Sequence, residues 1–356
     1  MLTLNGDDIM SNRRKKSKKK GLIIALVIVL VIAIPLCGGL LAVNHYLSKM
    51  DYGSDETLEI NPEYVDDITV PDADDDISEN IDDPRMWYND NIINILLIGC
   101  DKGSQSRYYP RADSIIILSI NKLNSTIKMV SLSRATYVSI PGYGNARINA
   151  SHAYGGPNLL IKTIEQNYKI RIDKYISIDF DGFIKAIDTL GGVDIEMTEQ
   201  EVNAIKGTMQ QNGITPSGAG KYHLNGNTAL EYSRLRGIDN DRNRTARQRN
   251  VLMAIFEKFK KMYTTESYSS LISKSLDYLD AVLPLVSTNF TKSEIIRQAP
   301  SYAGYLRWPV TEALIPKVAV PLTNINGTEV LILNWATVKN DIHEILYPGI
   351  EPQEQS

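Results

Sequence analysis

The chain is poor in cysteine and histidine, and the few that it has do not cluster. Its 356 residues include two cysteines and four histidines. Cys37 lies inside a long apolar run and Cys100 follows an acidic stretch, so we expect no disulfide between them. Zinc sites need several Cys or His ligands at short spacing, and the sequence has no such set. The fold must therefore be stabilised by its apolar core.

Common catalytic and nucleotide-binding signatures are also missing. The sequence contains neither a Gly-x-Ser-x-Gly nucleophile elbow nor a Gly-x-Gly-x-x-Gly dinucleotide fingerprint. Residues 217–221 partly match a phosphate-binding loop, but Thr215 replaces its first glycine and Tyr222 its closing Ser or Thr. These absences argue against the familiar serine-hydrolase, dinucleotide-binding and P-loop classes.

One long apolar segment, residues 21–43, contains no charged residue. A run of this length can span a bilayer as a helix. Seven basic residues lie within 13–20 and acidic sequence follows the segment, which predicts a cytoplasmic N-terminus. A cleaved signal peptide and a buried core helix are the alternatives, but the run is longer than an ordinary signal core. We predict a single-pass anchor, with residues 1–20 as a basic tail inside the cytoplasm.

The next stretch, residues 44–91, is strongly acidic. Within 51–90 there are 15 Asp or Glu residues and one base, Arg85. Such a block buries little apolar surface, so we expect a solvated linker between the anchor and a domain at residues 92–350. The net charge of −4 and the predicted exterior location argue against nucleic acid as a partner.

Residues 92–350 predict a single α/β domain with a central mixed sheet flanked by helices. Continuous apolar runs typical of buried strands occupy 92–99, 114–120 and 126–132, with a hairpin between the last two. Further strands are predicted at 174–180, 193–198 and 329–334. Helices are predicted over 155–167, over 181–190 with Asp181 as N-cap, from the arginine-rich stretch to 263, near 266–282, from 292, and over 335–346. Residues 207–227 are predicted to form a loop.

The predicted order of the strands places two aspartates where they could form a metal site. If the first two strands are neighbours, Asp101 and Asp113 approach each other at one sheet edge. Close carboxylates repel unless a cation lies between them, and Mg²⁺, or Mn²⁺ as an alternative, suits oxygen ligands. The competing interpretation is that Asp101 caps a turn and Asp113 pairs with Arg111.

Residues 232–249 contain six arginines, two aspartates and no lysine. A planar guanidinium can bind phosphate or carboxylate oxygens bidentately, whereas an ammonium acts as a point charge. The apolar residues that follow predict a helix, and a helix N-terminus favours a bound anion. The alternative is a solvated helix end with Asp–Arg pairs.

Taken in order, several blocks resemble the LytR–CpsA–Psr family of bacterial cell-envelope enzymes. The matching blocks are Asn94-Ile-Leu-Leu-Ile-Gly-Cys-Asp101, Arg111-Ala-Asp113, Ser131-Leu-Ser-Arg134, Arg147-Ile-Asn-Ala150, Tyr154-Gly-Gly156, Ile178-Asp-Phe-Asp-Gly-Phe183, Asp188-Thr-Leu-Gly-Gly-Val193, Leu224-Asn-Gly226, Ala229-Leu-Glu-Tyr-Ser-Arg-Leu-Arg236, Asp241-Arg-Asn-Arg244 and Arg247-Gln248. They extend over residues 92–262 and follow the predicted anchor. The order of the blocks makes the resemblance specific, although no single block does.

The resemblance implies transfer of a glycopolymer from an undecaprenyl-(pyro)phosphate carrier to a peptidoglycan hydroxyl at the bacterial cytoplasmic membrane. Teichoic acid and capsular polysaccharide are the expected cargo, and an apolar tunnel would hold the prenyl chain. By position, the implied metal ligands are Asp101 and Asp113. The implied catalytic residues are Asp113, Arg134, Arg236, Asp241 and Arg244. The implied pyrophosphate-binding residues are Arg111, Arg134, Arg234, Arg236, Arg244, Arg247 and Gln248.

Two positions depart from the family pattern. Ser-x-Pro-Arg-Asp is replaced by Ser131-Leu-Ser-Arg-Ala135, and Gly-Asp-Phe-Gly-Arg by Asn240-Asp-Arg-Asn-Arg244. Loss of the aspartate at Ala135 is the best support for an alternative function, a membrane-anchored non-catalytic regulator or scaffold that binds lipid-linked precursors, whereas the complete phosphate-binding set favours the enzyme. A third interpretation, a polyprenyl-pyrophosphate hydrolase with water as acceptor, needs the same residues as the transferase.

Overall fold

The computed structural model describes residues 48–49, 77–78, 80–101, 109–267, 270, 274, 277–278, 280–305, 307–325 and 327–354. The predicted anchor at residues 21–43 and most of the predicted linker lie outside the described residues. Among the described helices, none combines the length and apolar character needed to cross a membrane.

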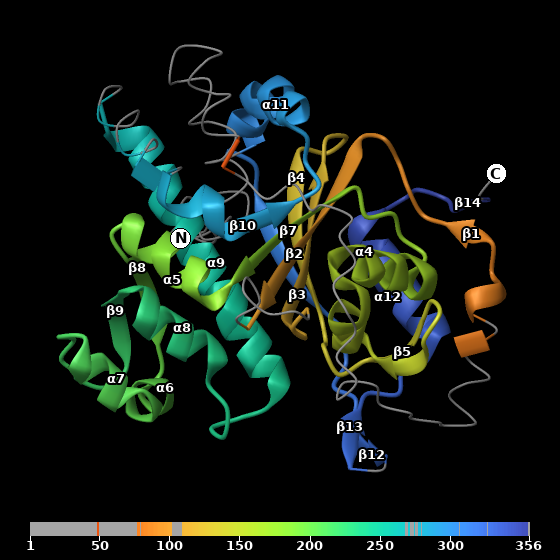
Figure 1. The fold of residues 1–356 in the computed structure, drawn as a ribbon, viewed down its shortest axis with the longest axis horizontal. Coiled ribbons are helices and arrows are strands. Elements are labelled where there is room, and N and C mark those ends of the chain that lie inside the picture. Colours follow the sequence, from red (N-terminus) through yellow and green to blue (C-terminus); the bar gives the residue numbers. More distant parts are fainter. Residues whose placement is uncertain are drawn as a thin grey trace, which may run out of the picture.

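A six-stranded mixed sheet forms the centre of the domain, in the order β10-β7-β2-β3-β4-β11 (Figure 1). Its strands are β2 (Ile92–Cys100), β3 (Ala112–Asn121), β4 (Thr126–Leu132), β7 (Lys174–Asp179), β10 (Val286–Thr288) and β11 (Val310–Ile315). Strands β2, β3 and β4 run antiparallel to one another in turn, while β7 is parallel to β2 and β11 is parallel to β4. The predicted α/β fold with a central mixed sheet is confirmed, as are the first three predicted strands and their hairpin.

Helices cover both faces of the sheet, as Figure 1 shows. One face carries α4 (Ile148–Tyr168) and α12 (Trp335–Leu346), and the other carries α5 (Phe180–Thr189), α8 (Gly226–Arg234) and α9 (Asp241–Thr265). Each face has its own apolar core. Along β2, Leu96 and Ile98 pack in the core under α4 and α12, whereas Ile95 and Leu97 pack in the core under α5, α8 and α9. Because both sides of the central strands are buried, their sequences are continuously apolar.

Smaller elements surround these layers. They are β1 (Arg85–Met86) paired with β14 (Gln353–Glu354), the hairpins β5 (Tyr137–Ile140) with β6 (Gly144–Arg147), β8 (Val193–Met197) with β9 (Gly220–Leu224) and β12 (Thr323–Ile325) with β13 (Thr328–Val330), and the helices α6 (Glu199–Ala204), α7 (Lys206–Gln211), η2 (Leu283–Leu285) and α11 (Lys292–Tyr305). The predicted loop over 207–227 is wrong, because it contains most of α7 and all of β9. Tyr222 and Leu224 are buried in β9, but the Gly- and Ser-rich flanks hid this alternation.

Two helix starts also differ from the prediction. The N-cap of α5 is Asp179 rather than Asp181, since the Asp179 carboxylate accepts a hydrogen bond from the Gly182 amide at 2.8 Å. Helix α4 begins at Ile148 and is interrupted by non-helical backbone at Gly155 and Gly156. Gly156 has φ +64°, and a Cβ there would lie 2.6 Å from the Tyr109 ring, so the close approach requires glycine.

The segment before β2 packs on the domain instead of remaining solvated. The Trp87 ring stacks on His343 with 3.5 Å between ring centroids. Lys169 donates hydrogen bonds from Nζ to the carbonyls of Ile81, at 3.0 Å, and Asp83, at 2.6 Å. The folded domain therefore extends N-terminally of residue 92.

The buried His343 makes the stability of this packing depend on pH. Burial lowers the pKa of His343 to about 4. The Nε2–H group of His343 donates a hydrogen bond to the Tyr168 carbonyl, with 3.0 Å between nitrogen and oxygen. An unfolded histidine titrates near about 6.5, so the unfolded chain binds more protons than the folded chain between these values. The stabilising preference for neutral His343 is complete above the unfolded pKa and is lost as the pH falls towards about 4.

We predict that the free energy of unfolding in urea falls between pH 7.5 and pH 5, by about 2 kcal/mol from one such histidine. His343→Phe retains a ring beside Trp87 but does not titrate, so it should lose less stability over the same interval. His152, whose pKa burial also lowers to about 4, is present in both proteins and cancels in the comparison. Equal losses in the variant and the wild type would contradict the assignment.

Candidate active site

A bulge between β2 and β3 sets the position of Asp113. Gly99 pairs with Ser114 across the two strands, whereas the next residue, Cys100, pairs with Ala112. Asp113 is therefore the extra residue of the bulge. Bulges redirect side chains and often lie beside active sites. The Asp113 side chain lines a cavity between the sheet and the helices that cover it.

Three carboxylates gather at this end of the sheet. Asp101 follows directly after β2, Asp113 lies in the neighbouring strand, and Asp179 ends β7 opposite Cys100. Burial raises the pKa of the Cys100 thiol to about 12, and the negative charges of these carboxylates add to the effect. The expected approach of Asp101 and Asp113 to one sheet edge thus agrees with the strand register.

A chain of ion pairs connects β4 to the start of α9. The Arg134 guanidinium, just after β4, donates from Nη1 to Asp113 Oδ1 at 2.8 Å. Its Nε lies 3.5 Å from Asp241 Oδ1, and the same oxygen lies 2.7 Å from Nη2 of Arg244. Asp241 therefore forms ion pairs with two arginines from different elements and keeps their guanidinium groups close together.

Arg244 is an arginine with almost no exposure to solvent, since 4 % of its side chain is accessible. Burial lowers the pKa of Arg244 to about 10; the Asp241 charge opposes this shift, and the charges of Arg134 and Arg236 add to it. The guanidinium remains charged at neutral pH. Arg134, Arg236 and Arg244 outnumber Asp113 and Asp241, the two carboxylates that pair with them, so the ion-pair network has one guanidinium in excess for an anion such as phosphate.

Other polar side chains reach the same cavity. Arg236 Nη2 lies 3.9 Å from Asp113 Oδ1, and 62 % of the Arg236 side chain is exposed. The Arg234 guanidinium lies over the Phe180 ring at 4.3 Å from its centroid. Gln248 donates from Nε2 to the Asp113 carbonyl at 3.5 Å. Arg234, Arg236, Arg244 and Gln248 all line the cavity.

Behind these groups the cavity is apolar and has a volume of about 110 Å³. Its apolar lining comes from β2, β3, β7, α5, α8 and α9, and consists of Leu97, Ile98, Ile116, Ile176, Ile178, Phe180, Phe183, Ala186, Leu230, Leu252 and Ile255. The solvent-exposed Arg236 marks the open end. A charged opening before an apolar interior suits an amphiphile with an anionic head and a hydrocarbon tail.

The cavity-lining residues of α9 form one helical stripe. Arg244, Gln248, Leu252 and Ile255 recur at spacings of four, four and three residues, which places them on one face. Leu252 and Ile255 were not predicted as lining residues, although this spacing was the signal that could have found them. Asp179, Phe180 and Phe183 were not predicted either, although all three belong to the Ile178-Asp-Phe-Asp-Gly-Phe183 block of the family resemblance.

Two predicted phosphate ligands lie elsewhere. Arg247 is buried on another side of α9, with its guanidinium bonded to both carboxylate oxygens of Asp239 at 2.7 and 2.8 Å. Arg111 is half-buried beside Ala112 and is not among the described residues that line the cavity. The structure thus brings together all five predicted catalytic residues, with Arg234 and Gln248, but not Arg247 or Arg111.

Asp101 and Asp113 are the candidate ligands of the predicted metal. Within the described ranges, no group of three or more His, Cys, Asp or Glu side chains is arranged to hold a metal ion. Mg²⁺ commonly binds through one or two carboxylates and completes its octahedron with waters and substrate phosphates. Asp101 and Asp113 fit such a site, one completed by a substrate, and the metal stays a prediction.

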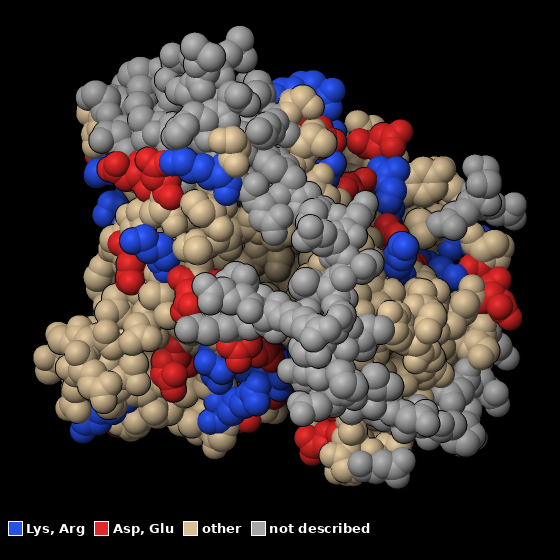
Figure 2. All heavy atoms as spheres, in the orientation of Figure 1, with Lys and Arg blue, Asp and Glu red and all other residues tan. Residues whose placement is uncertain are grey.

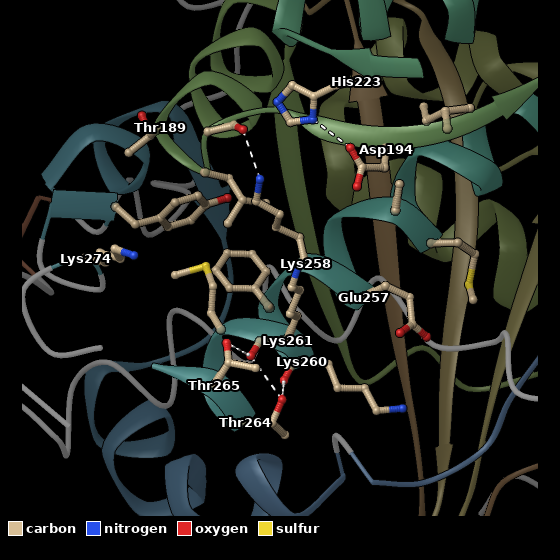
Figure 3. Close-up of a pocket in the computed structure, with 18 of the residues that line it drawn as sticks. Thr189, Asp194, His223, Glu257, Lys258, Lys260, Lys261, Thr264, Thr265 and Lys274 are labelled. Atoms are coloured by element: carbon tan, nitrogen blue, oxygen red, sulfur yellow. Dashed lines mark hydrogen bonds and ion pairs between the residues drawn. The ribbon is translucent and has the colours of Figure 1, made fainter. Parts of the chain in front are cut away.

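A larger hollow of about 1220 Å³ lies between the β8–β9 hairpin and the second half of α9 (Figure 3). His223 and Asp194 form a 2.7 Å pair in it, and Lys258 donates from Nζ to the Gly191 carbonyl at 3.0 Å. None of the predicted site residues is among its described lining. Figure 2 shows basic side chains beside acidic ones on the face in view.

Comparison with known proteins decides the family. The profile of the LytR_cpsA_psr family matches residues 62–343. The chain belongs to the LytR–CpsA–Psr family. It is 32% identical over 218 residues to TagU of Bacillus mycoides, named a polyisoprenyl-teichoic acid–peptidoglycan teichoic acid transferase. That match spans 60% of this chain and 66% of TagU.

Several solved structures share the fold. Protein gbs0355 from Streptococcus agalactiae superposes with a TM-score of 0.60 at 25% identity, covering 72% of this chain and 88% of that one. The family protein YwtF (TagT) of Bacillus subtilis, solved with bound octaprenyl pyrophosphate lipid, gives a TM-score of 0.55 at 24% identity and covers 74% and 95%. At this identity the second likeness extends to the fold alone.

The Asp241 bridge leads to a stability prediction. Asp241→Asn removes the negative charge between Arg134 and Arg244 and leaves a buried guanidinium without its partner. Breaking a fully buried ion pair costs about 3–5 kcal/mol, and partial exposure of Asp241 reduces the expected loss to about 1–3 kcal/mol. Urea unfolding of the variant and the wild type measures the difference. A variant as stable as the wild type would show that Asp241 does not compensate the Arg244 charge.

Proposed function

We propose that this chain transfers a glycopolymer of the teichoic acid or capsular polysaccharide type from an undecaprenyl-(pyro)phosphate carrier to peptidoglycan. The observation that carries the proposal is the grouping of Arg134, Arg236 and Arg244 at the open end of an apolar cavity. The name of the TagU relative supports the same activity. In this proposal residues 21–43 anchor the chain in the bacterial cytoplasmic membrane, with the domain outside.

The carrier would bind with its phosphates at the arginines and its prenyl chain inside the cavity. YwtF, which shares the fold, was solved with bound octaprenyl pyrophosphate, a ligand that combines such a charged head with an apolar chain. The cavity volume of about 110 Å³ is small beside the roughly 300–1,000 Å³ of typical ligand pockets. Binding of a long prenyl chain therefore requires this cavity to widen.

Catalysis of this transfer rests on charge neutralisation. As the acceptor oxygen bonds to the glycopolymer unit, the bond between that unit and the carrier breaks and negative charge grows on the departing prenyl (pyro)phosphate. Arginines fixed before the reaction stabilise such charge without reorganisation. Arg134 and Arg244 are fixed in this sense by Asp241, and Arg236 adds a third guanidinium.

The proton of the acceptor hydroxyl needs a base. We assign this role to Asp113, whose carboxylate lines the cavity among the arginines. Asp101 and Asp113 would hold Mg²⁺, with Mn²⁺ as an alternative. When bound, the metal would neutralise charge on the phosphates.

The regulator and the hydrolase remain the competing functions, because each would use the same site. Incubation of the full chain in detergent with lipid-linked glycopolymer and peptidoglycan oligomers separates the three. The proposal expects a covalent glycopolymer–peptidoglycan conjugate. Release of free polymer without conjugate indicates a hydrolase, and retention of intact lipid-linked polymer indicates a binding protein; either result overturns the transferase.

In the same assay we expect Arg134→Ala, Arg236→Ala and Arg244→Ala to reduce conjugate formation by at least roughly a hundredfold. Each change removes a guanidinium from the position where charge develops. Arg242→Ala is the matched control, because Arg242 donates to the carbonyls of Pro316, Lys317 and Val318 away from the cavity. Full activity in all three cavity variants would refute the assignment.

Metal dependence provides a separate prediction. Titration of conjugate formation with Mg²⁺ should show a higher half-saturating concentration in Asp101→Asn than in the wild type, because the change removes one anionic ligand from a site with few protein ligands. Asp113→Asn also removes the proposed base, so it should lose conjugate formation at every Mg²⁺ concentration. A half-saturating concentration unchanged in Asp101→Asn would exclude Asp101 as a metal ligand, and a wild-type rate in Asp113→Asn would exclude Asp113 from both roles.

A further inference from the structure

The loop between α8 and α9, residues 235–240, carries Arg236. Most of the Arg236 side chain is exposed, and its 3.9 Å separation from Asp113 is too long for a hydrogen bond. Little packing therefore holds this side chain itself. The place of its guanidinium depends on how firmly the loop backbone is held, and Gly237, with φ +85°, gives the loop a turn that few other residues tolerate.

A single buried guanidinium closes this loop. Arg247, two turns into α9, donates from Nη2 to the Leu235 carbonyl at 2.9 Å. The same guanidinium makes a bidentate pair with the Asp239 carboxylate, and only 2 % of the Arg247 side chain is exposed. Leu235 and Asp239 lie on either side of Arg236 in the sequence. Arg247 thus forms hydrogen bonds to the loop on both sides of Arg236, the residue that lines the cavity.

Two residues of helix α6 also contact the loop and Arg247. Gln200 donates from Nε2 to the Ile238 carbonyl at 2.8 Å, and Glu201 Oε1 lies 3.5 Å from Arg247 Nη1. Arg247 is thus balanced by two carboxylates, and the pKa of Asp239 is held below its usual range, first through its hydrogen bond to Arg247. No interaction described for the Arg247 guanidinium is with Asp113 or Asp241.

We propose that Arg247 and Asp239 form a positioning pair that sets the affinity for the carrier pyrophosphate by fixing the loop of Arg236, without contact between Arg247 and the phosphates. This inference rests on the proposed function, because it takes Arg236 to be a phosphate ligand. It gives Arg247 a role different from the direct phosphate contact that the sequence implies. Arg247 is a positioning residue in this account.

The test is a double-mutant cycle on the affinity of the full chain in detergent for farnesyl pyrophosphate. Arg247→Lys keeps the charge beside Asp239 and Glu201, but an ammonium cannot span the Leu235 carbonyl and the Asp239 carboxylate as a planar fork does. We expect roughly tenfold weaker binding from Arg247→Lys, a loss from Arg236→Ala, and little further loss when the two are combined. Arg242→Lys, the same substitution elsewhere on α9, should bind as the wild type does.

The outcomes separate the positioning pair from the proposed function. Additive losses would mean that Arg247 acts independently of Arg236, by direct contact or otherwise, and would overturn the pair. Wild-type affinity in Arg247→Lys would overturn it as well. Wild-type affinity in Arg236→Ala would instead remove Arg236 as a phosphate ligand, and with it the proposed site on which the pair depends.

A second variant tests the pair in case Arg247→Lys does not fold. Asp239→Asn acts from the less buried side of the pair, where 21 % of the Asp239 side chain is exposed, and should reproduce the loss of affinity. It should also show the same lack of additivity with Arg236→Ala. Thermal melting of each variant without ligand identifies any that is unfolded. A folded Asp239→Asn with wild-type affinity would contradict the pair.

Discussion

The ion pairs of Asp241 are the interaction on which the candidate site depends. Arg134 follows β4 and Arg244 opens α9, so these two positive charges come from distant parts of the chain. Without a carboxylate between them they would repel, and burial of Arg244 would be unfavourable. One Asp241 oxygen, 2.7 Å from Arg244 and 3.5 Å from Arg134, joins them at the opening of the cavity. The arginines are therefore directed at a common point before any anion arrives.

The sheet and α9 together convert this cluster into a site for an amphiphile. The β2–β3 bulge sets Asp113 among the arginines. From the same opening, one stripe of α9 continues from Arg244 through Gln248 to Leu252 and Ile255, passing from charged to polar to apolar. A prenyl pyrophosphate has the same order of chemical character along its length. The geometry thus supports recognition of head and tail by contiguous parts of one helix.

The features of the fold that could be predicted were those that depend on short stretches of sequence. Uninterrupted apolar runs predicted β2, β3 and β4 because both sheet faces are buried, and the pairing of β2 with β3 brings Asp101 and Asp113 to one edge. The outer strands β10 and β11 of the same sheet were not predicted, since they are short and carry no continuous apolar run. The β9 strand was missed because its Gly- and Ser-rich flanks look like a loop. The roles of Arg244 and Arg247 could not be separated, since they differ only in which side of α9 faces the cavity. Arg244 pairs with Asp241 inside the first turn of α9, whereas Arg247 pairs with Asp239 in the preceding loop. Which of the two arginines faces the cavity is decided by the packing of α9 on the sheet, which no local pattern encodes.

The central claim is that the arginine cluster and the apolar cavity act as one binding site. The most direct test is calorimetric titration of the full chain in detergent with farnesyl pyrophosphate, farnesol and inorganic pyrophosphate. If head and tail are recognised together, the prenyl pyrophosphate binds at least roughly a hundredfold more tightly than either part alone. Farnesol or inorganic pyrophosphate binding as tightly as farnesyl pyrophosphate would contradict a site that requires both.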